Sequence, residues 1–304
     1  MFLETRREVA AQLGIVWQDG APLMSSTTQP SPGEQPFYTF IASGTLLSDE
    51  RARWQVVFRH LTLASFIMAL FVANLRAALR LIYARPHMLS TRCCLVQAAV
   101  GFALSLVAIS VIFPEGPSCR TILLATTASI RIGDICISTV LLQRAYIAQN
   151  RSRWLLVFVP VIVAAPVYMI YATWASPPVL TIQTSGCVFI YSDYYPWIRF
   201  AFQAPMNVVL TAIFIKVAYR RYARLGSMAW GRLVREGIQT GLLLLLISLL
   251  CTFAVAFEFF GIYSIVLTVF EWSISSMLLV MHVENTQRAL QPAYEQRQIE
   301  CRLL

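Results

Sequence analysis

Lysine and histidine are nearly absent from this 304-residue sequence, which contains one lysine and three histidines. Lys216 lies far from the C-terminal apolar stretch where a Schiff-base chromophore would need a lysine, so that chemistry is excluded. His60, His87 and His282 lie near opposite faces of a predicted hydrocarbon layer about 30 Å thick, so they cannot share one zinc ion. We therefore expect neither a metal nor a cofactor.

Motifs of familiar enzymes are missing as well. The sequence has no Gly-rich phosphate loop, no Asp-rich prenyl-diphosphate motif and no nucleophile elbow. No catalytic residue is predicted from a motif, and we expect a protein that is not an enzyme.

Charged residues are also scarce: they make up 13% of the sequence, whereas hydrophobic residues make up 58%. A membrane-spanning helix needs about 20 mostly apolar residues. Seven stretches satisfy this requirement, namely residues 56–80, 92–113, 120–147, 154–175, 197–219, 237–260 and 262–283. The sequence therefore predicts an all-α membrane protein, a seven-transmembrane helix bundle in a lipid bilayer.

Basic residues indicate the orientation of the bundle. Of the 24 lysines and arginines, 16 fall in alternate connections and in the C-terminal tail. Because lysine and arginine keep loops on the cytoplasmic side, the N-terminus is expected outside and the C-terminus inside, most simply in the plasma membrane. This alternation explains the net charge of +9 without nucleic-acid binding.

Three regions follow from these assignments. Residues 1–54 are expected to be an extracellular, largely disordered tail, because residues 24–36 are rich in serine and proline. Residues 55–283 form the bundle, and residues 284–304 form a cytoplasmic tail with a short amphipathic helix. No signal peptide precedes the first span, which is expected to direct its own insertion. The final four residues, Cys301 to Leu304, fit a prenylation pattern that also occurs by chance.

Two of the seven cysteines differ from the others in position. Cys119 lies at the outer start of the third span, and Cys187 lies in the longest outer connection. Both face an oxidising compartment, so a disulfide is permitted, with two free thiols as the alternative.

This layout resembles that of rhodopsin-like G-protein-coupled receptors, in which a cysteine pair joins the top of helix three to the second outer loop. In that family an arginine follows the helix-three cysteine by 25 positions, and here Arg144 does so within Gln143-Arg144-Ala145-Tyr146. Asn74 and Pro205 also occupy positions at which the family has these residue types. The chain is thus similar to a divergent receptor, such as the receptor-like membrane proteins of fungi.

The resemblance implies an extracellular ligand, which the sequence leaves unidentified, and a cytoplasmic transducer such as a G protein. The residues expected at the coupling surface are Arg144, Tyr146, Arg220, Arg221 and Arg224. Attraction of the basic loop to anionic lipid is the alternative reading.

Charged groups inside the spans are the candidate site, because such groups are costly in a membrane. Arg131 and Asp134 share one face of the third span, and Glu271 lies in the seventh. They form either an internal ion-pair network or the floor of a ligand pocket. An outer polar rim is expected from Arg59, His60, Arg199 and Glu258. Above it, a ligand-contacting lid or an interfacial belt is expected from Tyr191, Tyr194, Tyr195 and Trp197.

The sequence thus favours a receptor-like membrane protein. One alternative is an intramembrane enzyme that acts on a lipid or terpenoid-like substrate, with Asp134 and Glu271 as acid and base. A small-solute transporter is the other.

Overall fold

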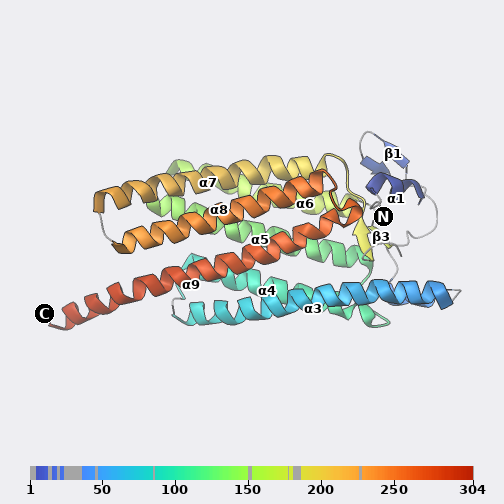
Figure 1. Ribbon diagram of the computed structural model, residues 1–304, viewed down its shortest axis with the longest axis horizontal. Coiled ribbons are helices and arrows are strands. Elements are labelled where there is room, and N and C mark those ends of the chain that lie inside the picture. Colours follow the sequence, from blue (N-terminus) through green and yellow to red (C-terminus); the bar gives the residue numbers. More distant parts are fainter. Residues whose placement is uncertain are drawn as a thin grey trace.

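The structure is a computed structural model that describes residues 5–12, 16–18, 21–23, 36–44, 47–84, 86–149, 153–176, 178–180, 186–225 and 228–303. Within these residues the chain is almost entirely helical. Long helices lie side by side along the longest axis of the molecule (Figure 1).

Seven long helices form the bundle in the described part of the chain. They are α3 (Leu47–Ala84), α4 (Leu89–Ile109), α5 (Cys119–Ala148), α6 (Phe158–Ala175), α7 (Tyr195–Leu225), α8 (Met228–Ala256) and α9 (Val266–Leu303). Short 3₁₀ helices extend three of them: η2 (Ser110–Ile112), η3 (Arg153–Val157) and η4 (Gly261–Ile265). Successive helices run in opposite directions (Figure 1).

Two β-hairpins and two short helices lie outside the bundle. Strands β1 (Val16–Gln18) and β2 (Ala21–Leu23) form one antiparallel pair, and β3 (Pro178–Leu180) pairs with β4 (Cys187–Phe189) in the other, with Leu180 opposite Cys187. Helices α1 (Arg6–Gln12) and α2 (Phe37–Ala42) precede the bundle. We call the end that carries β3 and β4 the disulfide end; α1 and β1 lie there too, and α9 ends at the opposite end (Figure 1).

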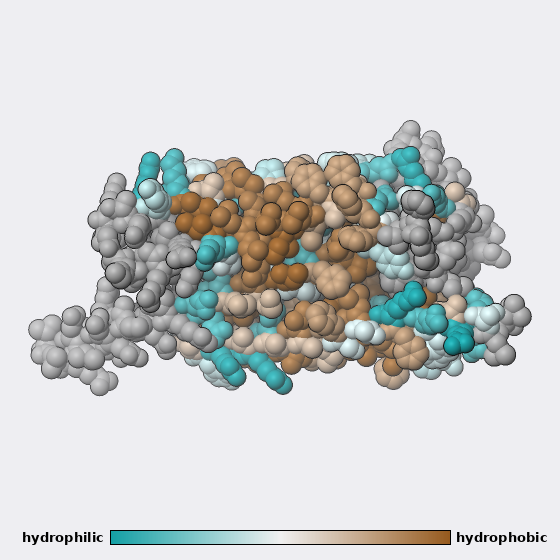
Figure 2. All heavy atoms as spheres, in the orientation of Figure 1, coloured by the Kyte–Doolittle hydropathy of each residue, from teal (hydrophilic) through white to brown (hydrophobic). Residues whose placement is uncertain are grey.

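Six helical segments in the described residues are long and apolar enough to cross a membrane: Ser48–Ala84, Leu89–Ile112, Cys119–Gln143, Arg153–Ala175, Ile238–Ala256 and Tyr263–Asn285. Figure 2 shows hydrophobic side chains gathered in a central band, with hydrophilic ones toward both ends. Several leucines on α8 are exposed, among them Leu242, Leu246 and Leu250. An exposed apolar surface of this kind is expected where lipid covers the protein. The protein is therefore a membrane-embedded helical protein.

Helix α7 is not among these six segments, although its predicted span, residues 197–219, lies within it. The side chains at positions 214, 217 and 218 of that span fall outside the described atoms, so the six segments do not bear on its full length. Its described part carries a polar stripe, because Arg199, Gln203 and Asn207 recur every four positions along the helix. The seven-span assignment consequently depends on α7 and remains a proposal.

A close approach of four helices forms part of the core. The ring of Phe71 in α3 lies 4.5 Å from that of Trp272 in α9. A Cβ added at Gly101 of α4 would lie 2.2 Å from Phe71, and one at Gly133 of α5 would lie 2.2 Å from Trp272. Glycine at these two positions lets α3, α4, α5 and α9 pack around the two aromatic rings.

The described parts of the N-terminal tail contain helices and strands. The side chains of Phe37 and Ile41 in α2 are buried against the start of α5, and residues 47–54 already belong to α3. Burial of these apolar residues supplies the free energy that orders the segment. Most of the serine- and proline-rich stretch, residues 24–35, lies outside the described residues.

A short amphipathic helix was expected within residues 284–304. Helix α9 continues through this region without a break to Leu303. No proline or glycine follows Val283 before Pro292, so nothing in residues 284–291 interrupts the helix.

Candidate functional site

A disulfide closes one end of the bundle. Cys119 at the start of α5 is bonded to Cys187 of β4, with their Cα atoms 5.5 Å apart, which confirms the expected pairing. It fixes the β3–β4 hairpin against α5. Among the described cysteines, Cys93, Cys94, Cys136 and Cys251 form no disulfide.

Below the disulfide, α5 carries the first ion pair. Arg131 donates from Nη1 to a carboxylate oxygen of Asp134 at 2.7 Å, as the spacing of three residues on one helix face predicts. The Arg131 side chain is 5% exposed and that of Asp134 is 17% exposed. Because the pair is buried to this extent, removal of either side chain would leave the other as an uncompensated buried charge and destabilise the protein strongly.

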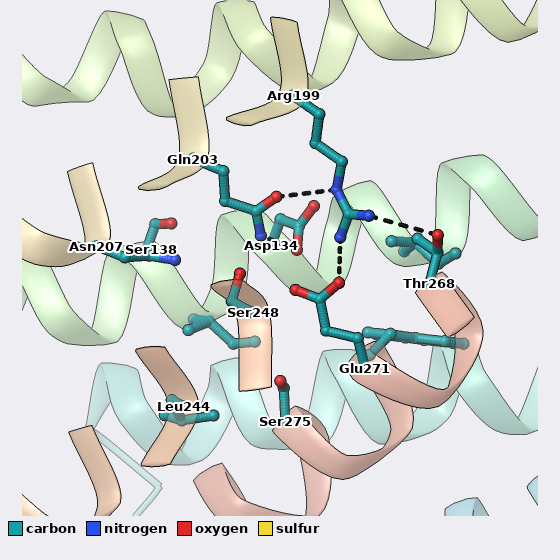
Figure 3. Close-up of a pocket in the computed structure, with 13 residues that line it drawn as sticks. Asp134, Ser138, Arg199, Gln203, Asn207, Leu244, Ser248, Thr268, Glu271 and Ser275 are labelled. Carbon is teal, nitrogen blue, oxygen red and sulfur yellow. Dashed lines mark hydrogen bonds and ion pairs between the residues drawn. The ribbon is translucent and has the colours of Figure 1, made fainter. Parts of the chain in front are cut away.

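A second ion pair joins α7 to α9. Arg199 donates from Nη2 to Glu271 at 2.5 Å and from Nη1 to the hydroxyl of Thr268 at 3.4 Å (Figure 3). Both charged side chains are almost completely buried, at 3% and 5% exposure. Ser248 of α8 hydrogen-bonds the Glu271 carboxylate as well. One carboxylate therefore binds groups from two neighbouring helices.

Gln203 connects the two pairs. Its amide oxygen accepts a hydrogen bond from Nε of Arg199 at 3.2 Å, and its amide nitrogen donates to Asp134 at 3.2 Å. The contacts thus run without a gap from Arg131 through Asp134, Gln203 and Arg199 to Glu271. We call these five residues the ion network. It links α5, α7 and α9. Figure 3 shows four of its members, Asp134, Gln203, Arg199 and Glu271, pointing toward one another between those helices.

Arg199 requires a correction, because the sequence placed it on an outer rim. The segment between β4 and α7 is itself buried: Ile190, Tyr191 and Ser192 are at most 6% exposed. Helix α7 therefore begins inside the bundle, and its fifth residue, Arg199, reaches Glu271. Sequence reasoning also missed Gln203, although its spacing of four residues from Arg199 was a usable signal.

The other predicted rim residues do not converge on the ion network. Arg59 is exposed, and Glu258 is partly exposed at the C-terminal end of α8 with a φ of 48°. The ring of His60 stacks on Phe37 at 5.6 Å, and its Nε2 lies 3.1 Å from the carbonyl oxygen of Ala108.

The predicted aromatic lid divides into two parts. Tyr191 and Tyr195 are buried and pack together in the bundle, with ring centroids 5.5 Å apart. Tyr194 and Trp197 are 45% and 47% exposed, and Trp197 stacks edge-on against Phe257. The exposed pair matches an interfacial position, whereas the buried pair belongs to the core.

The predicted coupling residues lie at the opposite end of the bundle. Tyr146 packs against the α5–α6–α7 core, and Arg220 is exposed. Arg144, Arg221 and Arg224 lie in helices α5 and α7, but their side chains fall outside the described atoms. No contact joins this group to the ion network among the described residues.

Three cavities border the ion network. One, about 30 Å³, lies among α5, α7, α8 and α9 and is lined by Asp134, Arg199, Gln203 and Glu271 (Figure 3). A second, also about 30 Å³, lies among α5, α6 and α7, and Arg131 is one of its lining residues. The third and larger cavity, about 130 Å³, lies nearer the disulfide and is lined by residues that include Cys187, His60, Tyr195 and Arg131. The two small cavities have room for little more than a water molecule or two each, whereas the larger could hold a small organic molecule.

No protein-family model matches the sequence, and no curated protein matches it significantly. The function therefore has to be argued from the site itself.

Proposed function

We propose that this chain is a receptor-like integral membrane protein with seven spans, its N-terminus outside and its C-terminus in the cytoplasm. It binds a small extracellular ligand and transmits binding to its cytoplasmic end. The supporting observation is the ion network, which joins three helices directly beside a cavity at the disulfide end.

The ion network suits a switch because its members depend on one another. Removing a hydrogen-bond partner from a buried charge is costly, so a shift of one helix favours a concerted shift of the others. A ligand that binds one arrangement more tightly than the other moves the population between them. Arg131 borders both the larger cavity and the network, so it is the residue through which a ligand acts.

The enzyme alternative receives less support from the geometry. A general base needs a carboxylate that is free to take a proton. Asp134 is bound by Arg131 and Gln203, and Glu271 is bound by Arg199 and Ser248. Both carboxylates are thus held in structural contacts, which suits a lock between helices better than an acid–base pair.

The orientation is tested on intact cells. An epitope on the N-terminus is expected to bind antibody without permeabilisation, and an epitope after Leu304 only after permeabilisation. The reverse pattern would contradict the assignment of outside and inside.

Transmission is tested by the reactivity of a cysteine at the opposite end of the bundle. Tyr219 of α7 is 65% exposed, and Tyr83 of α3 is 87% exposed. In a Cys301→Ser background, Tyr219→Cys is expected to react with a maleimide at a different rate once Glu271→Gln breaks the network. Tyr83→Cys is the matched control, because α3 contributes no residue to the network. Equal rates at position 219 with and without Glu271→Gln would refute transmission.

A further inference from the structure

The larger cavity has an apolar wall and very few charged groups. Leu63, Ile122, Leu123 and Val269 belong to that wall, and Thr126 and Thr127 add two hydroxyls. Among its described lining residues, Arg131 is charged, and His60 and Tyr195 can titrate. Cys187 also lines the cavity, but its sulfur is held in the disulfide. A mainly apolar cavity with a few convergent polar groups is typical of small-molecule sites.

Arg131 brings a group rich in hydrogen-bond donors to this cavity. Its side chain is 5% exposed, and its guanidinium group carries five N–H groups, of which one on Nη1 binds Asp134. Nε is covered on all sides and has no hydrogen-bond partner among the described residues, so a ligand would be bound by the Nη atoms. An oxygen atom of a ligand in the cavity would accept a hydrogen bond from this guanidinium group.

The charges of the neighbouring network argue that this ligand is neutral. Arg131 is paired with Asp134, and Arg199 is paired with Glu271, so the four charges sum to zero. A carboxylate or an ammonium group added beside them would be an uncompensated charge in a medium of low dielectric constant. A carbonyl or hydroxyl oxygen accepts a hydrogen bond from Arg131 without that penalty.

The size of the cavity limits the ligand further. Its volume, about 130 Å³, is close to the roughly 150 Å³ that suffices for benzene in an engineered protein cavity. We propose that the cavity binds a small uncharged molecule with a mainly apolar skeleton and one accepting oxygen, such as a ketone, ester or alcohol of about six to eight carbons. This inference rests on the proposed receptor function and specifies its ligand class.

Phe37 of α2 closes the cavity toward the disulfide end. The Phe37 side chain is fully buried and packs against Cys119 and Ile122, and its ring stacks on His60. Ile122 and His60 are also lining residues of the cavity. A ligand arriving from that end must displace Phe37, so Phe37→Ala is expected to speed both association and dissociation.

Four probes of one chain length separate the chemical classes: 2-heptanone, heptane, heptanoate and heptylamine. With purified protein in nanodiscs, 2-heptanone is expected to raise the unfolding temperature saturably, and heptanoate and heptylamine are expected not to. Arg131→Lys keeps the positive charge beside Asp134 but lacks the planar guanidinium group and its five donors. Because a hydrogen bond to a charged group is worth about 1.5–3 kcal/mol, this substitution should weaken 2-heptanone binding by about tenfold or more and leave heptane unaffected.

Filling the cavity supplies the control for partition of the probes into lipid. Val269→Phe, or Leu63→Phe if the first variant does not fold, is expected to abolish the effect of 2-heptanone. Leu79→Phe places the same ring at an exposed site on α3 and is expected to leave binding intact. Tighter binding of heptanoate than of 2-heptanone would overturn the proposal. Undiminished binding of 2-heptanone by both Val269→Phe and Leu63→Phe would overturn it as well.

The outcomes also separate this inference from the proposed function. Binding of 2-heptanone without any change in the reactivity of Tyr219→Cys supports the ligand class but overturns the receptor function. No binding, together with a reactivity change caused by Glu271→Gln, overturns the ligand class and leaves the receptor function standing.

Discussion

Arg199 donates a hydrogen bond to Glu271 at 2.5 Å, although 72 positions separate the two residues in the sequence. Each side chain is almost completely buried. Among the described residues this is the one ion pair that joins α7 to α9. This pair fixes the start of α7 against α9 and forms one end of the ion network.

Replacing one member of that pair should lower the free energy of unfolding by more than the second replacement then adds. Arg199→Met leaves Glu271 charged without its partner, and Glu271→Gln leaves Arg199 likewise. Each single variant is expected to lose about 3–5 kcal/mol of stability, and the double variant is expected to recover part of the loss. Chemical unfolding in detergent measures the three values; a double variant that loses the sum of both single effects contradicts this expectation.

The disulfide should stabilise the folded protein considerably, because its two cysteines are 68 positions apart. The chain-entropy model gives about 4 kcal/mol for a loop of that length. Cys119→Ala, Cys187→Ala and the double variant should all lose a similar amount, since any of them removes the same bond. Thermal unfolding measures the loss, and mass spectrometry after alkylation without reduction checks that wild-type Cys119 and Cys187 are unavailable.

Gln97 offers a way to increase stability. Its side chain in α4 is fully buried, and neither its amide oxygen nor its amide nitrogen has a hydrogen-bond partner among the described residues. Gln97→Leu should therefore raise stability by about 1–3 kcal/mol. Asn74→Leu is the matched control: Asn74 is also buried, but it donates to Ser276 at 3.3 Å, so its replacement should lower stability.

Gly101 should not tolerate a methyl group. A Cβ at this position would lie 2.2 Å from the ring of Phe71, and overpacking of this kind costs about 1–3 kcal/mol. Gly241 is the matched control, because its Cβ would lie 3.3 Å from a methyl group of Thr211, a far milder contact, so alanine there should lose much less stability than alanine at position 101. Thermal unfolding of Gly101→Ala, Gly241→Ala and Gly101→Ala with Phe71→Leu compares the effects. A failure of Phe71→Leu to improve Gly101→Ala would show that the contact with Phe71 is not the cause.

The sequence predicted those features that depend on residues of a single helix, such as its length and the contacts along one of its faces. The span 120–147 became α5 at Cys119–Ala148, because a long and mainly apolar run predicts a membrane helix and its approximate ends. The Arg131–Asp134 pair followed from spacing within one helix. The Arg199–Glu271 pair could not be predicted in the same way, because it depends on how deeply the buried segment before α7 enters the bundle. Gln203 carries no charge, so reasoning from charged groups alone could not identify it as the bridge between the two pairs.

The central claim is that Arg131, Asp134, Gln203, Arg199 and Glu271 act as one unit, and a double-mutant cycle across the network tests it most directly. Hydrogen bonds through Gln203 and Arg199 join Asp134 to Glu271 in the part of the chain that the structure describes. If the network is one unit, Asp134→Asn and Glu271→Gln should show a coupling free energy of about 1 kcal/mol or more in detergent unfolding, because members of a shared network are not additive. Strict additivity of the two substitutions would show that the two ion pairs are independent and would contradict the account.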